Sequence, residues 1–410
     1  MLEALTRALC HHPEAQRSWR QAQMRAAEIG LAKGAYLPQF SSTLDYARTE
    51  QDYQRSLGTE FSATTRGYSI RMNWLLLDMG RRGARLEQAR ALLDAANAGH
   101  DRALQDAMLD FLQAYLDSAR MHAGWRASRE AERLAVLALE TATALHEAGV
   151  TALTDKLMAE AAASRATAER VQAERAWRKA RGRLALTLGL SPETELQLPD
   201  LADLNLRHDS VPTYDQLSDD MLDRHPAVTA AMAEVSAAEQ RLRLVKAEAR
   251  PALTLNGQYV RSPPPNSSVL SPDNVVSIGV QLSVPLFQGF EPHYRARAAD
   301  AELESQRVAL AAVRRQVRQE LWAAYQDWTA ARDNRLAVLA LAGSVKQTLH
   351  VTEGRYREGV VGITDWLEAQ RIQAETERLK VDAETDWHAA RVRLAASMGQ
   401  LGLWILQPSF

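Results

Sequence analysis

Four segments of the chain alternate apolar and polar side chains, the pattern of β-strands that present one apolar face. They are residues 39–48, 67–77, 252–261 and 275–285. In the clearest of them the apolar positions are Tyr68, Ile70, Met72, Trp74 and Leu76. Each segment has about nine residues or more, which is enough to cross a bilayer at a tilt. The alternation therefore predicts four strands.

A half-buried sheet of a soluble protein alternates in the same way, so the alternation alone leaves both kinds of sheet open. Long polar loops within the two strand pairs, at residues 47–67 and 262–274, favour membrane strands, because outer-membrane barrels carry long loops on their outer side. Four strands do not close a barrel, and lipid does not tolerate an open strand edge. We therefore expect the protomer to share its strands with copies of itself. Two copies would give eight strands and three would give twelve.

The rest of the chain is rich in Ala, Leu, Glu, Gln and Arg, a helix-forming mixture. We expect one helix to run to about residue 35 and a second to about residue 249, each stopped by a proline. Gly80–Ala148 contains no proline and as a helix would be roughly 100 Å long at about 1.5 Å per residue. Its Ala- and Leu-rich face needs partner helices, which indicates coiled-coil-like packing against the return segments 151–188 and 361–398.

The chain also contains an internal duplication. His12-Pro13 recurs as His225-Pro226, Gly149-Val150 as Gly359-Val360, and Trp177 as Trp387, with further matches in the same order between them. Each half therefore has the same plan of helix, two strands and long helical hairpin. We divide the chain into a first structural repeat at 1–190, a linker at 191–214, a second structural repeat at 215–402 and a C-terminal tail at 403–410.

Composition excludes several other kinds of protein. The 49 basic and 51 acidic side chains leave a net charge of -2, so no global field favours a nucleic-acid partner. Cys10 is the one cysteine, which rules out an internal disulfide and a multi-Cys metal site. The ten histidines show no metal-ligand spacing, and no phosphate loop or Ser/His/Asp motif is present. We expect no cofactor, no metal and no catalysis.

Two sequence features bear on how the chain would reach or cross a membrane. No apolar stretch of about 20 residues is available for a transmembrane helix. Met1 is not followed by a charged start and an apolar core, so no secretory signal is visible in this numbering.

The two hairpin turns carry the most specific motifs. They are Gly149-Val-Thr-Ala-Leu-Thr-Asp-Lys-Leu157 and Tyr356-Arg-Glu-Gly-Val-Val-Gly-Ile-Thr-Asp-Trp-Leu-Glu-Ala369. With the strand exits Leu77-Asp-Met-Gly-Arg81 and Pro285-Leu-Phe-Gln-Gly289, the chain resembles the outer-membrane efflux protein family of TolC-like channel-tunnels. The resemblance implies a mainly α protein with a small β part. Long antiparallel helical hairpins would form an α-barrel tunnel, and four strands per protomer would enter a shared, twelve-stranded trimeric β-barrel.

The resemblance also implies partners and a location. It implies a homotrimer in the lipid of the bacterial outer membrane, with most of the chain in the periplasm. A periplasmic adaptor (membrane fusion) protein and an inner-membrane transporter of RND or ABC type would deliver the substrates, for drug efflux or type I protein secretion. The competing interpretation is a soluble coiled-coil scaffold whose sheet packs on its own helices; an enzyme is a more remote alternative.

By motif match, the resemblance assigns Asp365 and Glu368 to a periplasmic gate. They stand at i and i+3, so a helix places both on one face, and three copies would form an acidic ring that attracts cations. It assigns Tyr356, Thr154 and Asp155 to hydrogen bonds that hold this gate shut. The sequence departs from the family at Val361, where some relatives have an arginine that joins this latch.

Two further interpretations concern the same turns and the strands. Asp155 and Asp365 alternatively serve only as caps of the helices that follow Gly149 and Gly359. On the strands, four aromatic residues are candidates for an interfacial girdle that faces the membrane: Tyr46, Tyr68, Trp74 and Tyr259.

Overall fold

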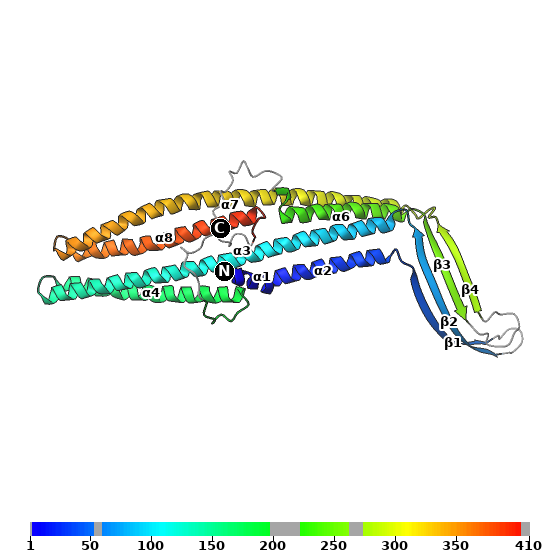
Figure 1. The fold of residues 1–410 in the computed structure, drawn as a ribbon, viewed down its shortest axis with the longest axis horizontal. Coiled ribbons are helices and arrows are strands. Elements are labelled where there is room, and N and C mark those ends of the chain that lie inside the picture. The colour runs from blue at the N-terminus through cyan, green and yellow to red at the C-terminus, as the bar shows by residue number, and fades with distance from the viewer. Residues whose placement is uncertain (1, 53–59, 197–221, 262–273, 403–410) are drawn as a thin grey trace. The chain divides into compact units, whose positions relative to one another are not determined.

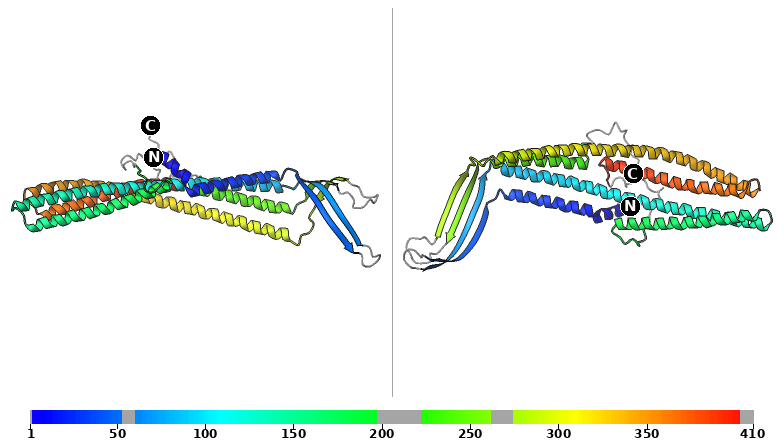
Figure 2. Two further views of the ribbon diagram at one scale, coloured as in Figure 1. Left: turned by 90° about the horizontal axis from the view of Figure 1, so that it is seen from below. Right: turned by 180° about the vertical axis from the view of Figure 1, so that it is seen from behind.

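A computed structural model describes residues 2–52, 60–196, 222–261 and 274–402. The first half contains α1 (Leu2–His11), α2 (Pro13–Gly34), β1 (Gln39–Asp52), β2 (Glu60–Leu77), α3 (Arg81–Glu147) and α4 (Leu153–Thr187). The second half contains α6 (Pro226–Glu248), β3 (Ala252–Arg261), β4 (Asn274–Ser283), α7 (Glu291–Arg357) and α8 (Ile363–Ser397). Helices α3 and α7 have 67 residues each, and α4 and α8 have 35 each. The two halves thus build the same helical hairpin (Figures 1 and 2).

The four predicted strands form one antiparallel sheet in the order β1-β2-β3-β4. The register places Phe40 opposite Met72, and Trp74 opposite Leu255. Because directly opposite residues in an antiparallel pair point to the same side, these pairings bring the apolar positions of all four strands onto one face. Thr, Asn, Gln and Ser side chains occupy the other face of β3 and β4.

The first strand pair is longer than the sequence pattern predicted. β1 continues to Asp52 and β2 begins at Glu60, so most of the predicted polar loop 47–67 is strand. Pairs such as Arg48↔Thr64 are polar on both strands. The backbones of β1 and β2 therefore pair here although the sequence shows no apolar alternation. A β-bulge after Leu75 also breaks the expected alternation, and Leu77 pairs with Leu253. The second predicted loop lies almost entirely outside the described residues.

The chain forms two compact units that cut across the two repeats. One consists of Met1–Trp19, Ala98–Thr229 and Val313–Phe410, and we call it the hairpin unit. The other consists of Arg20–Asn97 and Ala230–Ala312, and we call it the strand unit. Each unit contains parts of both halves of the sequence. Most of the predicted linker, and the whole predicted tail at 403–410, lie outside the described residues.

The main core of the hairpin unit joins four helices. Leu5 of α1, Phe111 and Leu112 of α3, Leu184 of α4 and Val392 of α8 are all at most 2% exposed. Two side-chain bonds tie helix ends to this core: Arg7 Nε donates to the Leu188 carbonyl at 3.1 Å, and Gln105 Nε2 donates to the Gly399 carbonyl at 2.8 Å. The two halves of the sequence are therefore packed into one core. Within the described segments, we find no helix with the length and apolarity needed to span a membrane.

In the strand unit, a buried ion pair fixes the turn from β2 into α3. Arg82 Nε lies 3.0 Å from Asp78 Oδ2, and both side chains are about one-tenth exposed or less. The carboxylate of Asp78 also accepts the Arg82 backbone N–H at 2.8 Å, which caps the first turn of α3. The Arg82 guanidinium donates in addition to the Leu75 and Leu76 carbonyls. This network holds the end of the strand against the start of the helix.

Gly399→Ala is expected to lower the melting temperature of the detergent-solubilised protein. Gly399 has φ +67°, and a Cβ there would lie 2.8 Å from Pro226 Cδ and 3.0 Å from His225 Cδ2. The left-handed backbone alone costs a non-glycine residue about 1–2 kcal/mol. The control is Gly343→Ala in the interior of α7, where a Cβ meets nothing within 4 Å and alanine favours the helix by roughly 0.5–1 kcal/mol. Circular dichroism melts that ranked the two variants equally would contradict this account.

Candidate functional site: the hairpin tips and the apolar strand face

The two hairpin turns have nearly the same backbone. Gly149 and Gly359 both have φ +73°. The next residue in each turn, Val150 or Val360, donates its N–H back across the turn at 2.9 Å, which is the Schellman pattern that ends a helix at a left-handed glycine. The predicted turn glycines thus stand where each hairpin reverses.

A small apolar core, which we call the tip cluster, lies beside these turns. It consists of Ala138, Ala142, Ala159, Tyr356, Ile363 and Trp366. Trp366 is 1% exposed, and its ring stacks on that of Tyr356 at a centroid distance of 4.8 Å. The cluster joins residues of α3, α4, α7 and α8, so it holds both hairpins together. Val361 packs against it and therefore contributes apolar contact at the position where some relatives carry an arginine.

Among the described residues, the predicted latch residues form no hydrogen bonds with one another, although Tyr356 belongs to this cluster. Tyr356 is 4% exposed, and among the described residues its hydroxyl has no hydrogen-bond partner. Burial raises the pKa of the Tyr356 phenol, and the nearby negative charge of Asp155 raises it further. Thr154 is exposed and Asp155 is half-buried. Tyr356 and Asp155 are thus close enough to interact electrostatically, and a latch role for the three residues stays a prediction.

The alternative that Asp155 and Asp365 cap their helices by side-chain hydrogen bonds is wrong. The N-cap residues are Ala152 and Gly362, and neither helix start has a side-chain cap bond. Both aspartates instead lie within the first helical turn, where a carboxylate interacts favourably with the helix dipole.

The two predicted gate acids differ in their surroundings. Both are exposed. The carboxylate of Glu368 accepts two hydrogen bonds from Arg371, at 2.7 and 2.8 Å, and these bonds lower the pKa of Glu368. Asp365 forms no ion pair within the part of the chain that the structure describes. Asp365 is therefore the uncompensated acid of this pair, and Arg371, one helical turn from Glu368, is a site residue that the sequence analysis missed.

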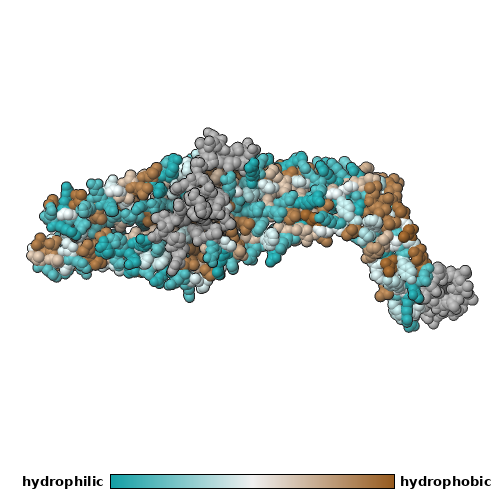
Figure 3. Space-filling view, viewed as in Figure 1, coloured by the Kyte–Doolittle hydropathy of each residue, from teal (hydrophilic) through white to brown (hydrophobic). Residues whose placement is uncertain are grey.

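The apolar face of the sheet is open to its surroundings. Leu44 is 82% exposed and Ile278 is 78% exposed. Single exposed apolar residues are common on protein surfaces, but a whole exposed apolar face marks a surface that contacts lipid or another protein. Figure 3 shows apolar surface gathered where the sheet meets the helices of the strand unit. This face needs a cover that one protomer does not supply.

The predicted girdle residues occupy two levels of the sheet. Tyr68 and Tyr259 make an edge-to-face contact at 6.3 Å, and Arg66 lies over the ring of Tyr46. Trp74 stands nearer the helices, where its Nε1 donates to the Tyr36 carbonyl at 2.9 Å. An indole with its N–H bonded at the edge of an apolar face is typical of a membrane interface.

The sequence profile described as outer membrane efflux protein matches residues 4–190 and 217–400. The chain belongs to the outer membrane efflux protein family. Its members are channels, so the family does not point to an enzyme. The match extends over both halves of the chain and favours the channel over the coiled-coil scaffold.

Individual relatives cover nearly the whole chain. Protein CyaE of Bordetella pertussis is 30% identical over 405 residues, which are 98% of this chain and 84% of CyaE. The outer-membrane channel OprN has the same fold, with a TM-score of 0.84 at 20% identity over 98% of this chain and 90% of OprN. The open state of the Neisseria gonorrhoeae MtrE outer membrane channel gives 0.82 at 19% identity over 97% and 88%. The predicted TolC-like channel-tunnel fold is confirmed.

Tyr356→Phe is expected not to destabilise this efflux-family protein at pH 8, because the hydroxyl that it removes has no partner among the described residues. Because the folded state favours the neutral phenol, the free energy of unfolding is unaffected below the ordinary tyrosine pKa of about 10. It falls as the pH rises above that value. Wild type should therefore lose melting temperature relative to Tyr356→Phe between pH 9 and 11.5. Tyr294→Phe, at a 64% exposed tyrosine, is the control and should follow wild type. A large loss at pH 8 in Tyr356→Phe would instead indicate a bonded latch.

Proposed function

We propose that three copies of this chain form a passive conduit across the outer membrane and the periplasm. The observation that carries the proposal is the sheet β1–β4, which exposes one apolar face and in which β1 and β4 each pair on one side only. In lipid, each unpaired backbone group costs several kcal/mol. Pairing β4 of one copy with β1 of the next removes both edges. Three copies is the number that the family resemblance implies.

The two faces of such a sheet suit a water-filled passage. The exposed apolar face would contact lipid, with Tyr46, Tyr68, Trp74 and Tyr259 at the interfaces. The opposite face, with Thr254, Asn256 and Gln258, would line the lumen. A passage of this kind lets hydrated substrates through without chemistry, so the driving force comes from partner proteins.

The periplasmic end of the conduit is proposed to lie at the hairpin tips. Asp365 and Glu368 would form the acidic constriction, and Tyr356, Thr154 and Asp155 would hold it. The turns also expose apolar side chains that suit a periplasmic adaptor: Val150, Leu153, Leu157 and Val360. An inner-membrane transporter of RND or ABC type would supply either drugs or a polypeptide, and the pump decides between these substrates.

Ile278→Arg is expected to prevent assembly in the membrane, whereas Ser277→Arg is expected to be tolerated. Ile278 lies on the exposed apolar face and Ser277, its neighbour in β4, on the opposite face. An arginine on the lipid face costs about 2–4 kcal/mol per copy near the bilayer midplane. Light scattering in mild detergent should give about three times 45.5 kDa for wild type and Ser277→Arg. A wild-type monomer, or normal trimers of Ile278→Arg inserted in vesicles, would refute the shared barrel.

Asp365→Asn is expected to reduce block of single-channel current by Mg²⁺ more than Glu368→Gln does. The two substitutions remove the same charge, but Glu368 is already bonded to Arg371, so its carboxylate is less available to a divalent cation. Planar-bilayer recordings of both variants, with K⁺ against Cl⁻ selectivity measured in parallel, separate the two acids. Unchanged Mg²⁺ block in Asp365→Asn would remove this residue from the constriction.

A further inference from the structure

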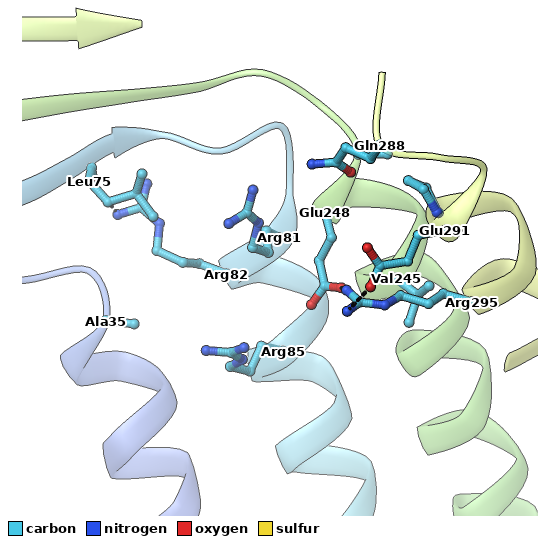
Figure 4. A pocket seen from close by; sticks show the side chains of 12 residues that line it. Ala35, Leu75, Arg81, Arg82, Arg85, Val245, Glu248, Gln288, Glu291 and Arg295 are labelled. Carbon is cyan, nitrogen blue, oxygen red and sulfur yellow. Dashed lines mark hydrogen bonds and ion pairs between the residues drawn. The ribbon is translucent and has the colours of Figure 1, made fainter. Parts of the chain in front are cut away.

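A cavity of about 370 Å³ opens in the strand unit, where β2 passes into α3 and β4 passes into α7. Figure 4 shows its charged side chains, with the arginines of α3 facing a group from α6 and α7. The charged lining residues are Arg81, Arg82, Arg85, Arg295, Glu248 and Glu291. Four guanidinium groups against two carboxylates give the cavity a positive balance.

Two of the four arginines are already bonded. Arg82 is held by Asp78 and by two backbone carbonyls, and its guanidinium lies 4.6 Å from the centre of the Tyr36 ring. Arg295 pairs with Glu291 at 2.5 Å and with Glu248 at 3.8 Å. Both glutamates of the cavity therefore have Arg295 as their partner.

The other two arginines lack such partners. Arg81 and Arg85 stand one helical turn apart on α3, and neither forms an ion pair within the described residues. Arg81 Nε is buried and has no hydrogen-bond acceptor there. Two guanidinium groups without ion-pair partners leave the cavity with an excess of donors, so the cavity favours an acceptor from outside the protomer. An anion with several oxygens matches two adjacent guanidinium groups.

Exposed apolar residues neighbour, along the chain, several residues that line this charged cavity. Leu286 is 92% exposed, Phe287 76% and Phe290 68%, and they flank the lining residue Gln288. Tyr36 is likewise the sequence neighbour of a lining residue, Ala35. A free anion gains nothing from such surroundings, whereas an amphiphile with an anionic head gains apolar contact along its tails.

We propose that this cavity binds the phosphate of a phospholipid headgroup through Arg81 and Arg85, with the acyl chains against Leu286, Phe287 and Phe290. The proposal rests on the proposed function, because it needs the strand unit to stand in a membrane. It adds a defined lipid site at the level where the sheet meets the helices. The exposed apolar residues Leu286, Phe287 and Phe290 favour a lipid over a protein carboxylate, because a carboxylate alone would leave them uncovered.

Native mass spectrometry of the delipidated, full-length protein in detergent tests the site. The probes are phosphatidylglycerol, diacylglycerol with the same acyl chains, and inorganic phosphate. Wild type should bind phosphatidylglycerol in preference to the other two. Arg81→Gln/Arg85→Gln should raise the Kd for phosphatidylglycerol at least about tenfold, the effect of losing one charge-assisted hydrogen bond. Arg81→Lys/Arg85→Lys keeps the charge, loses the fork geometry and should fall between the two.

The matched control is Arg90→Gln/Arg241→Gln, which removes two exposed arginines of the same unit that pair with Glu87 and Glu302; its Kd should equal that of wild type. Equal binding of inorganic phosphate would make the cavity a free-anion site, and equal binding of diacylglycerol would make it purely apolar; either overturns the proposal. Trimer mass and conductance are measured on the same samples. If the protein forms a normal conducting trimer and the Arg81 and Arg85 variants bind phosphatidylglycerol as wild type does, this inference alone is refuted. If wild type forms no trimer, the proposed function is refuted.

Discussion

Unpaired backbone groups along the outer edges of β1 and β4 are the constraint on which the rest of the structure depends. One protomer has four strands with an exposed apolar face, and neither water nor lipid alone suits this sheet. Water disfavours the apolar face, and lipid disfavours the open edges. Closure with further copies, as proposed, would satisfy both. In that assembly the helical hairpins of each copy would be repeated parts of a larger structure.

Duplication supplies the hairpins with equal lengths, but the two tips are not equivalent in packing. Tyr356, Ile363 and Trp366 of the second half are buried in the tip cluster, at 4%, 2% and 1% exposure. Their counterparts in the first half are His146, Leu153 and Lys156, of which Leu153 is 55% exposed. The two turns thus have the same backbone, but the side chains beside the second turn are buried and those beside the first are more exposed. The second hairpin therefore supplies the large side chains of the cluster, and the first hairpin supplies only its alanines.

Periodicity in the sequence predicts what depends on the backbone and on neighbours along the chain. It predicted the four strands, the side of the sheet on which Ile70 and Trp74 lie, the long helices and the turn glycines, because each follows from local pattern and conformational preference. It did not predict the extension of β1 and β2, because Arg48 and Thr64 pair as polar residues without alternation. It also did not show that Arg371 pairs with Glu368, although the i, i+3 spacing contained that signal. The membership of the tip cluster could not be read from sequence, since one helical period does not say which helices meet.

The tip cluster combines the favourable burial of apolar rings with the cost of burying polar atoms. Trp366 and Tyr356 bury two large rings, each of which stabilises the packed tips by about 1.5–3 kcal/mol. Against this, the Trp366 Nε1 and the Tyr356 hydroxyl are buried without acceptors among the described residues, at a cost of about 1–3 kcal/mol each. The unsatisfied polar atoms therefore offset part of the stabilisation that the two rings supply. An all-apolar cluster of the same size would pack the tips more firmly, because it would bury no donor without an acceptor.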